Sequence, residues 1–249
     1  MPLYGKLDTA DHAAHAPRIE SLVAAADEFA IEKCQILTFT YEIDIEKGFA
    51  ATPKALHPSI PSYCQIAFRS HPSGPFGPFT IAELRINARA STHYLAYCIG
   101  AFTDNAQARE FFGQRYGANV READVKLTRM YHGVEGRVTL GGSPIFAGLL
   151  EKPHYISGSD VLYTPNLNLA DVAGMLKLVH QEMEYTLGKA ERGKTVSSAF
   201  DAAAFGDARV VLREPLPATL TEATIRYTAV RYLLDPDKPA LTGTEVLAA

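Results

Sequence analysis

The chain has 249 residues, a formal net charge of −4 at pH 7 and 47% hydrophobic residues. This length is sufficient for one large β domain, or two small ones, with a buried core. Acidic and basic residues are interspersed, which argues against a basic face for nucleic acid, so the expected partner is at most a neutral or acidic small molecule.

The cysteines predict neither a disulfide framework nor a zinc site. Cys34, Cys64 and Cys98 are odd in number, far apart and set in apolar runs, which is typical of buried thiols in a reducing compartment. The histidines show no metal-binding spacing. The N-terminus lacks the pattern of a signal peptide, and no apolar segment approaches the length of a membrane span. We therefore expect a soluble, cytoplasmic protein with no metal, no cofactor and no membrane partner.

The first part of the chain is expected to be an N-terminal arm and helix covering residues 1–32. Residues 1–16 show no clear apolar period and are interpreted as a mobile or draped arm. After Pro17, helical spacing of apolar residues predicts a short amphipathic helix through Ile19, Leu22, Val23, Ala26 and Phe29. Residues 34–44 then alternate between apolar and polar side chains, which predicts a strand.

Two further strands and a short helix are predicted in the middle of the chain. Phe79–Arg89 alternates strictly, and the face that carries Glu83 and Arg85 should line either solvent or a polar pocket. His93–Phe102 is apolar on both faces and should be a central strand. Asp104 is the expected N-cap of the helix that follows.

The second half is predicted to contain strands at residues 125–131, 134–140, 145–150, 208–213 and 223–234. Between them, apolar residues at helical spacing predict a longer helix that starts near Asn168 or Asp171 and ends at Gly188. Gly188–Thr195 fits the P-loop pattern, but no strand precedes it and no helix follows, so a flexible basic loop is the better interpretation. The tail is expected to be extended.

These elements predict a mainly β (α+β) fold, an antiparallel sandwich or closed barrel with a few helices outside. In order, the segments resemble the acetoacetate decarboxylase-like superfamily over most of residues 33–235. The resemblance is carried by Phe39-Thr40-Tyr41-Glu42-Ile43-Asp44, Pro53 with Leu56-His57-Pro58, Gly77-Pro78-Phe79-Thr80, Phe102-Thr103-Asp104-Asn105, Gly117 with Ala123-Asp124-Val125-Lys126-Leu127, and Pro165-Asn166-Leu167.

The resemblance implies a double-psi or cone-shaped antiparallel β-barrel with an internal pocket and a few peripheral helices, and a homo-oligomer. The expected domain spans residues 33–235, with a helical insertion at about 170–188 and a C-terminal tail at 236–249.

The resemblance also implies a Schiff-base lysine, and this sequence departs from it there. The family's two lysine positions fall on Val120 and Arg121, or on Arg121 and Glu122 when the preceding helix anchors the comparison. Arginine cannot replace the nucleophile because guanidinium stays protonated. Lys126 would need a slipped register to serve.

Two other family positions change polarity: the pocket arginine falls on Glu42 and the pocket glutamate on Ile81. We therefore hypothesise a rebuilt site, with Glu83, and with it Glu42, as a general acid or base whose pKa is raised by burial. Arg121 or Arg85 would bind a carboxylate or stabilise an enolate. The competing interpretation is a solvated stripe in which Glu83 and Arg85 face outward.

The expected function is that of a cofactor-independent enzyme, a lyase, dehydratase, isomerase or cyclase, acting on a small keto-acid-like or oxygenated substrate. One alternative is a non-catalytic small-molecule-binding relative, and another is a decarboxylase with a displaced lysine. The residues expected to contact the substrate are Ile81, Arg85, Tyr97, Val120 and Tyr131.

Overall fold

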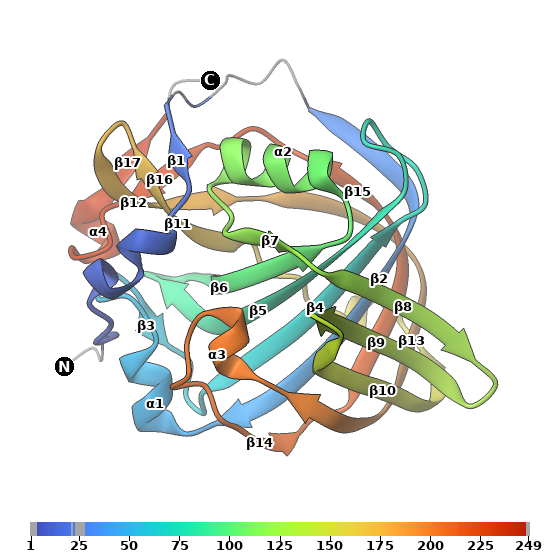
Figure 1. Ribbon diagram of the computed structural model, residues 1–249. Helices are drawn as coiled ribbons and strands as arrows, with labels where there is room; N and C mark the ends of the chain where they lie inside the picture. Colours follow the sequence, from blue (N-terminus) through green and yellow to red (C-terminus); the bar gives the residue numbers. More distant parts are fainter. Residues whose placement is uncertain (1–3, 21, 23–27, 248–249) are drawn as a thin grey trace.

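The computed structural model describes residues 4–20, 22 and 28–247 (Figure 1). Its helical segments are η1 (Thr9–His15), α1 (Ile45–Ala50), α2 (Ala106–Tyr116), η3 (Gly158–Asp160), α3 (Ala202–Phe205) and α4 (Ala240–Gly243). Its strands are β1 (Arg18–Ile19), β2 (Phe29–Ile43), β3 (His57–Pro58), β4 (Tyr63–His71), β5 (Phe79–Ala90), β6 (His93–Thr103), β7 (Val120–Glu122), β8 (Asp124–Met130), β9 (Gly133–Leu140), β10 (Ser143–Ile156), β11 (Asn166–Val172), β12 (Met175–Gln181), β13 (Met183–Phe200), β14 (Leu212–Pro215), β15 (Ala218–Tyr227), β16 (Tyr232–Leu234) and β17 (Thr244–Val246).

All of these strands belong to one mostly antiparallel sheet. Its centre runs β13, β15, β2, β4, β5 and β6, each paired with the next. The sheet curves strongly (Figure 1). As a result β8, which pairs with β9 on the far side of the sheet, contacts β5 and β6. The helices are short and lie at the periphery, so the predicted mainly β fold is confirmed.

The central strands are buried on both faces, and each face carries its own apolar core. The first core contains Phe39, Phe68 and Phe146, whose ring centroids lie 5.4–6.2 Å apart. The second core lies on the opposite face, where α2 supplies Phe112 and Tyr116. Every side chain of β5 from Phe79 to Ile86 is buried, which explains why a charged pair on this strand must be satisfied inside the protein.

The N-terminal arm, expected to be mobile or draped, packs against the barrel. Leu7 is completely buried and bridges to Pro53, and the η1 segment packs against β11. Arg18–Ile19 forms β1, paired in parallel with β11. Part of the predicted helix falls on residues 21 and 23–27, which lie outside the described residues, and β2 already begins at Phe29.

The helix predicted from residue 168 or 171 to 188 is wrong, as is a helical insertion at 170–188. This segment forms β11, β12 and the start of β13, with Val172 and Met175 paired across a two-residue turn. Ala173 and Gly174 both have positive φ, +51° and +86°, as such a hairpin turn requires. Leu178 and Val179 are both fully buried; a strand covered on both faces lacks alternation and mimics a helical stripe.

Backbone conformation predicts opposite effects for two glycine-to-alanine substitutions, one in this hairpin and one in α2. Gly174→Ala places a side chain at positive φ and should lower the free energy of unfolding by about 1 kcal/mol. Gly113→Ala lies inside α2, where an added Cβ would meet its nearest neighbour at 3.8 Å, and should raise it by about 0.5–1 kcal/mol. Urea unfolding measures both; a stabilising Gly174→Ala would contradict the turn.

Smaller corrections concern the ends of elements. Asn105, rather than Asp104, caps α2 with its side chain, whereas Asp104 accepts a hydrogen bond from the Thr80 amide. Residues 189–198 are not a flexible loop, because β13 continues to Phe200 between β10 and β15. The strand predicted at 208–213 is displaced to Leu212–Pro215, and the one predicted at 223–234 is split into β15 and β16.

The tail is not fully extended, since it folds into α4 and β17. No helix in the described part of the chain is long and apolar enough to cross a membrane.

The outer edge of β6 is paired by two different strands that do not meet. β11 pairs with Ala96–Cys98 and β7 pairs with Ala101–Thr103. Ile99 and Gly100 between them have no paired strand on this side in the described structure. The same point carries an irregularity in the β5–β6 register, between Leu84 and Arg85. The wall of the barrel is therefore interrupted here.

Candidate functional site

A cluster of buried polar side chains lies on the second-core face of β4, β5 and β11. We call Gln65, Arg69, Glu83, Arg85 and Asn166 the polar cluster. The pairing of β2, β4 and β5 places Ile36, Arg69 and Ile81 in one cross-strand row, and both isoleucines belong to the second core. Side chains alternate along a strand, so Glu83 and Arg85 lie on this same face.

Hydrogen bonds connect all five members. Arg69 donates from Nη1 and Nη2 to the two carboxylate oxygens of Glu83, the Nη1–Oε2 distance being 2.8 Å. Asn166 donates from Nδ2 to Glu83 Oε2 at 3.0 Å and accepts from Arg85 Nη1 at 3.0 Å. Arg85 Nη2 also donates to Gln65 Oε1 at 2.6 Å. Two-pronged arginine–carboxylate pairs of this kind hold both partners in fixed orientation.

Glu83 is only 1% exposed, yet it is held in the charged form. Burial by itself raises the pKa of its carboxyl group, but the charge and hydrogen bonds of Arg69, with Arg85 and Asn166, outweigh that effect, so the pKa lies below its ordinary value. The expectation of a glutamate with a raised pKa is therefore wrong. Glu83 is a carboxylate that can accept a proton, and it is not a general acid in this state.

The polar cluster carries one positive charge in excess. Arg69 and Glu83 balance each other, whereas Arg85 is 3% exposed and both its Nη groups donate to neutral amide oxygens. Among the described residues, no carboxylate forms an ion pair with Arg85. Within the described part of the chain, the Nε groups of both arginines are buried without a hydrogen-bond partner. An unbalanced buried cation is costly, and a carboxylate ligand would remove that cost.

Neutral polar side chains lie near the two arginines: Tyr163 and Tyr185 near both, and His71 near Arg69. Tyr163 and Tyr185 stack with ring centroids 4.4 Å apart, and burial raises the pKa of both phenols. His71 Nε2 forms a hydrogen bond of 2.7 Å with the Tyr227 hydroxyl. Burial, together with the charge of Arg69, lowers the pKa of His71 to about 3. These groups add no charge to the cluster, and the hydroxyls of Tyr163 and Tyr185 contact Thr221 Oγ1 and Met183 Sδ.

Two predicted substrate contacts, Ile81 and Val120, lie on the same face as Glu83. Ile81 is fully buried beside Arg69 in the β4–β5 pairing. Val120 is paired with Ala101, which in turn is paired with Glu83. The position that the family resemblance gave to the lysine in one register is thus a valine, in the same cross-strand row as Glu83.

Arg121 does not join the polar cluster. It is paired with Phe102, a member of the first core on the opposite face, and its guanidinium lies 4.4 Å from the Phe102 ring centroid. Burial lowers the pKa of Arg121. Alternation along β7 explains the outcome, because Val120 and Arg121 must point to opposite faces.

Glu42 is also separate from the polar cluster. It is paired with Tyr63, whereas the residue across from Glu83 on β4 is Ala67, which is paired with Thr38. Four residues along β2 correspond to about 13 Å. Glu42 therefore lies near the end of its strand, half-buried, rather than beside Glu83.

The two predicted tyrosines lie elsewhere. Tyr97 is buried, and its hydroxyl is 3.1 Å from His12 Nδ1, beside a small cavity rather than in the polar cluster. Tyr131 is fully exposed at the tip of the β8–β9 hairpin, so it lines no enclosed site.

Sequence reasoning missed Arg69, Gln65 and Asn166. Arg69 and Gln65 are the polar members of the strand-like run 63–69, and Asn166 stands in the Pro165-Asn166-Leu167 segment. Two polar residues four apart in a buried strand, on one face, were the only local signal. Their partners come from other strands, so the pairing register was needed to connect them.

Comparisons with known proteins place the fold. No family model and no curated protein matches the chain. Among solved structures, acetoacetate decarboxylase from Legionella pneumophila is similar, with a TM-score of 0.74, 16% identity and coverage of 89% of this chain and 94% of that one. An acetoacetate decarboxylase-like enzyme from Sphingomonas wittichii gives a TM-score of 0.65, 15% identity and coverage of 84% and 94%.

A third similar structure is the enduracididine biosynthesis enzyme MppR complexed with pyruvate. Its TM-score is 0.67, with 12% identity and coverage of 85% of this chain and 91% of that one.

Proposed function

The chain has the acetoacetate decarboxylase-like fold, and from this premise we propose that it is an enzyme acting on a small keto acid without a Schiff base. The observation that carries the proposal is the buried Arg85, whose charge has no carboxylate partner among the described residues. A substrate carboxylate would supply it. The enzyme activity of proteins with this fold and the pyruvate bound to MppR support a keto acid as substrate.

Binding would also change Glu83. The excess positive charge contributes to the low pKa of Glu83. A carboxylate bound at Arg85 neutralises that charge, so the pKa of Glu83 rises and its carboxylate becomes a stronger base. It would then remove a proton next to the keto group, while Arg85 and the neutral phenols stabilise the enolate oxygen. The resulting reaction class is enolisation, leading to isomerisation, dehydration or cyclisation.

A displaced Schiff-base lysine has little support. Lys126 is exposed and its Nζ lies 2.8 Å from the Asp124 carboxylate. All other lysines are exposed except Lys177, which is half-buried and pairs with Glu245. A nucleophilic lysine needs a site that favours its neutral form, and none of these positions offers one.

A non-catalytic binding protein is the second candidate. The observation in its favour is that both oxygens of Glu83 are already occupied by Arg69, so the carboxylate could serve only to hold that arginine. A binder would retain the carboxylate requirement at Arg85 but would not exchange substrate protons.

Pyruvate is the probe that separates these functions. Calorimetry should detect its binding, and Arg85→Gln should weaken that binding at least tenfold, about 1.4 kcal/mol. The matched control is Arg89→Gln, an exposed arginine on the same strand, which should leave the affinity unchanged. Equal affinity in wild type and Arg85→Gln would contradict the proposed site.

Proton abstraction from the substrate is measured in a separate exchange experiment. In deuterium oxide, wild-type protein should exchange the pyruvate methyl protons, followed by NMR, and Glu83→Gln should slow this exchange at least 100-fold. Binding without any exchange would indicate the non-catalytic function. Borohydride in the presence of acetoacetate should trap no adduct; a trapped lysine would restore the Schiff-base mechanism.

A further inference from the structure

The interruption in the pairing of β6 is occupied by a small cavity. Its lining comes from β6 (Tyr97, Cys98 and Ile99), from Leu169 on β11, from Asn119 just before β7, from Gly206, and from His12, His15 and Ala16 of the N-terminal arm. The cavity thus lies where neither β11 nor β7 covers β6. It measures about 20 Å³, roughly the room that one water molecule needs.

Cys98 connects this cavity to the polar cluster. It lines the cavity and is paired with Arg85 across the β5–β6 register. Burial raises the pKa of the Cys98 thiol, and the charges of Glu83, Arg85 and Arg69 also act on it. Only one residue layer therefore separates the cavity from the excess positive charge at Arg85.

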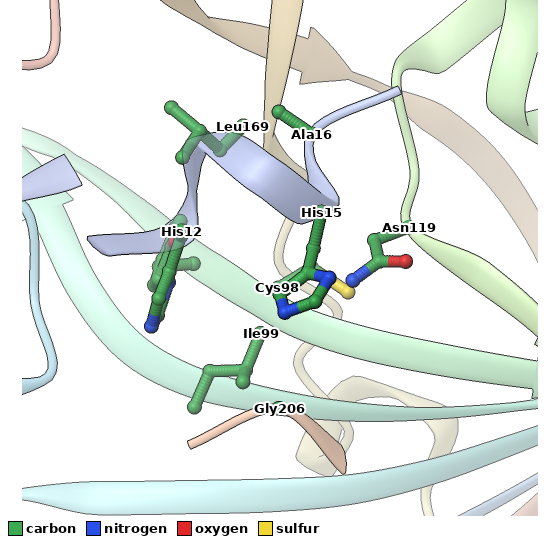
Figure 2. A pocket seen from close by; sticks show the side chains of 9 residues that line it. His12, His15, Ala16, Cys98, Ile99, Asn119, Leu169 and Gly206 are labelled. Atoms are coloured by element: carbon green, nitrogen blue, oxygen red, sulfur yellow. The ribbon is translucent and has the colours of Figure 1, made fainter. Parts of the chain in front are cut away.

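The η1 segment closes the cavity from outside. Figure 2 shows His12 and His15 extending from this segment toward β6, with Asn119 directed at the same space. Leu7 before η1 and Ile19 after it are both buried, so the segment is anchored at its two ends. Between these anchors, Thr9 is also buried, and His12 and Asp11 make polar contacts with the barrel.

These contacts are few. His12 Nδ1 lies 3.1 Å from the Tyr97 hydroxyl, and its Nε2 lies 3.3 Å from Arg209 Nη2 and 3.7 Å from the Asp207 carboxylate. Arg209 also reaches Asp11 of η1 at 3.9 Å. Past the buried Thr9 at the start of η1, these polar contacts hold a stretch of otherwise exposed residues, so this part of the segment can lift without unfolding the sheet.

We propose that this interruption is the entrance to the polar cluster, that η1 is its lid, and that His15 and Asn119 contact the part of the keto acid furthest from Arg85. The proposal rests on the proposed function for the identity of the ligand. The cavity in its closed form is too small for pyruvate, so the lid must move for the substrate to pass.

Cys98 is a built-in reporter of lid opening. We would measure modification of each cysteine by a thiol reagent on the native full-length protein, resolved by peptide mass spectrometry. His12→Ala should accelerate modification of Cys98 at least fivefold, while Cys34 and Cys64, buried elsewhere, stay constant. His132→Ala, an exposed histidine on the β8–β9 hairpin, is the matched control and should change nothing.

A second variant tests passage itself. Asn119→Phe fills the cavity and should slow both Cys98 modification and pyruvate association at least fivefold, with pyruvate protecting Cys98 in the wild type. The entrance is overturned if His12→Ala leaves Cys98 unchanged, or accelerates all three cysteines together through global unfolding.

The two proposals can fail independently. Selective acceleration of Cys98 without pyruvate binding would support the entrance and reject the keto acid. Pyruvate binding with no effect of either variant on Cys98 or on association would support the proposed function and reject the entrance.

Discussion

Replacing Arg69 by methionine is expected to lower the free energy of unfolding by about 3–5 kcal/mol at neutral pH. Arg69 and Glu83 are each at most 2% exposed in their side chains and form a two-pronged ion pair. Without Arg69 the carboxylate of Glu83 stays buried with only Asn166 and the more distant charge of Arg85 to compensate it. Urea unfolding of the wild type and the variant measures the loss.

Two controls isolate the buried charge as the cause. Adding Glu83→Gln to Arg69→Met removes the unpaired carboxylate and should recover a large part of the loss. Arg226→Met removes a guanidinium that is 52% exposed and also pairs with glutamates, and it should change stability little because water screens exposed pairs. Equal effects of Arg69→Met and Arg226→Met would refute a special role for the buried pair.

Acidification to pH 5 is expected to cost about 4 kcal/mol of stability through two histidines that are buried in neutral form. Burial, with Arg69, lowers the pKa of His71 to about 3, and burial, with His93 and Arg231, lowers the pKa of His180 to about 4, from an ordinary value of 6.5. As the pH falls below about 6.5, both imidazoles become protonated in the unfolded chain but stay neutral in the folded protein. Each histidine contributes about 2 kcal/mol of stability at neutral pH that is lost by pH 5.

The measurement compares the free energy of unfolding at pH 7.5 and pH 5, where most carboxylates are still ionised. His71→Gln should reduce the difference between the two pH values by about 2 kcal/mol, whatever its effect at pH 7.5. His132→Gln, at an exposed position, should leave the difference unchanged. A His71→Gln variant with the wild-type difference would show that His71 is protonated in the folded protein at pH 5.

The sequence predicted the side of β5 that matters, because strict alternation over Phe79–Arg89 put Glu83 and Arg85 on one face. It could not predict their partners. Arg69 reaches Glu83 only because β4 and β5 pair with Ala67 opposite Glu83, and this register depends on the turn and on contacts with both cores. The expected partner Arg121 fails for the same reason, since one residue along β7 decides the face.

The helix predicted from residue 168 or 171 to 188 is wrong because the strands that form there are buried on both faces. Between Asn166 and Gln181 almost every side chain near the strand centres is covered, so polarity carries no period-2 signal. Ala173-Gly174 was the local indication of a turn, but alanine at positive φ is uncommon and was not recognised as one. Strands were predicted near β8, β9 and the first half of β10, where Gly141-Gly142 marks the β9–β10 turn, but β10 itself continues to Ile156.

Among the described strands, none pairs with the outer edge of β6 at Ile99 and Gly100, and this gap also affects the energy landscape of the folded state. Strand separation at this point disrupts pairing with β5 alone, whereas one residue further in either direction it would also disrupt a ladder to β11 or β7. Amide hydrogen exchange should therefore show a weak seam at the centre of an otherwise strongly protected barrel, opening at free energies well below global unfolding. Local opening at this seam would leave both apolar cores of the barrel intact.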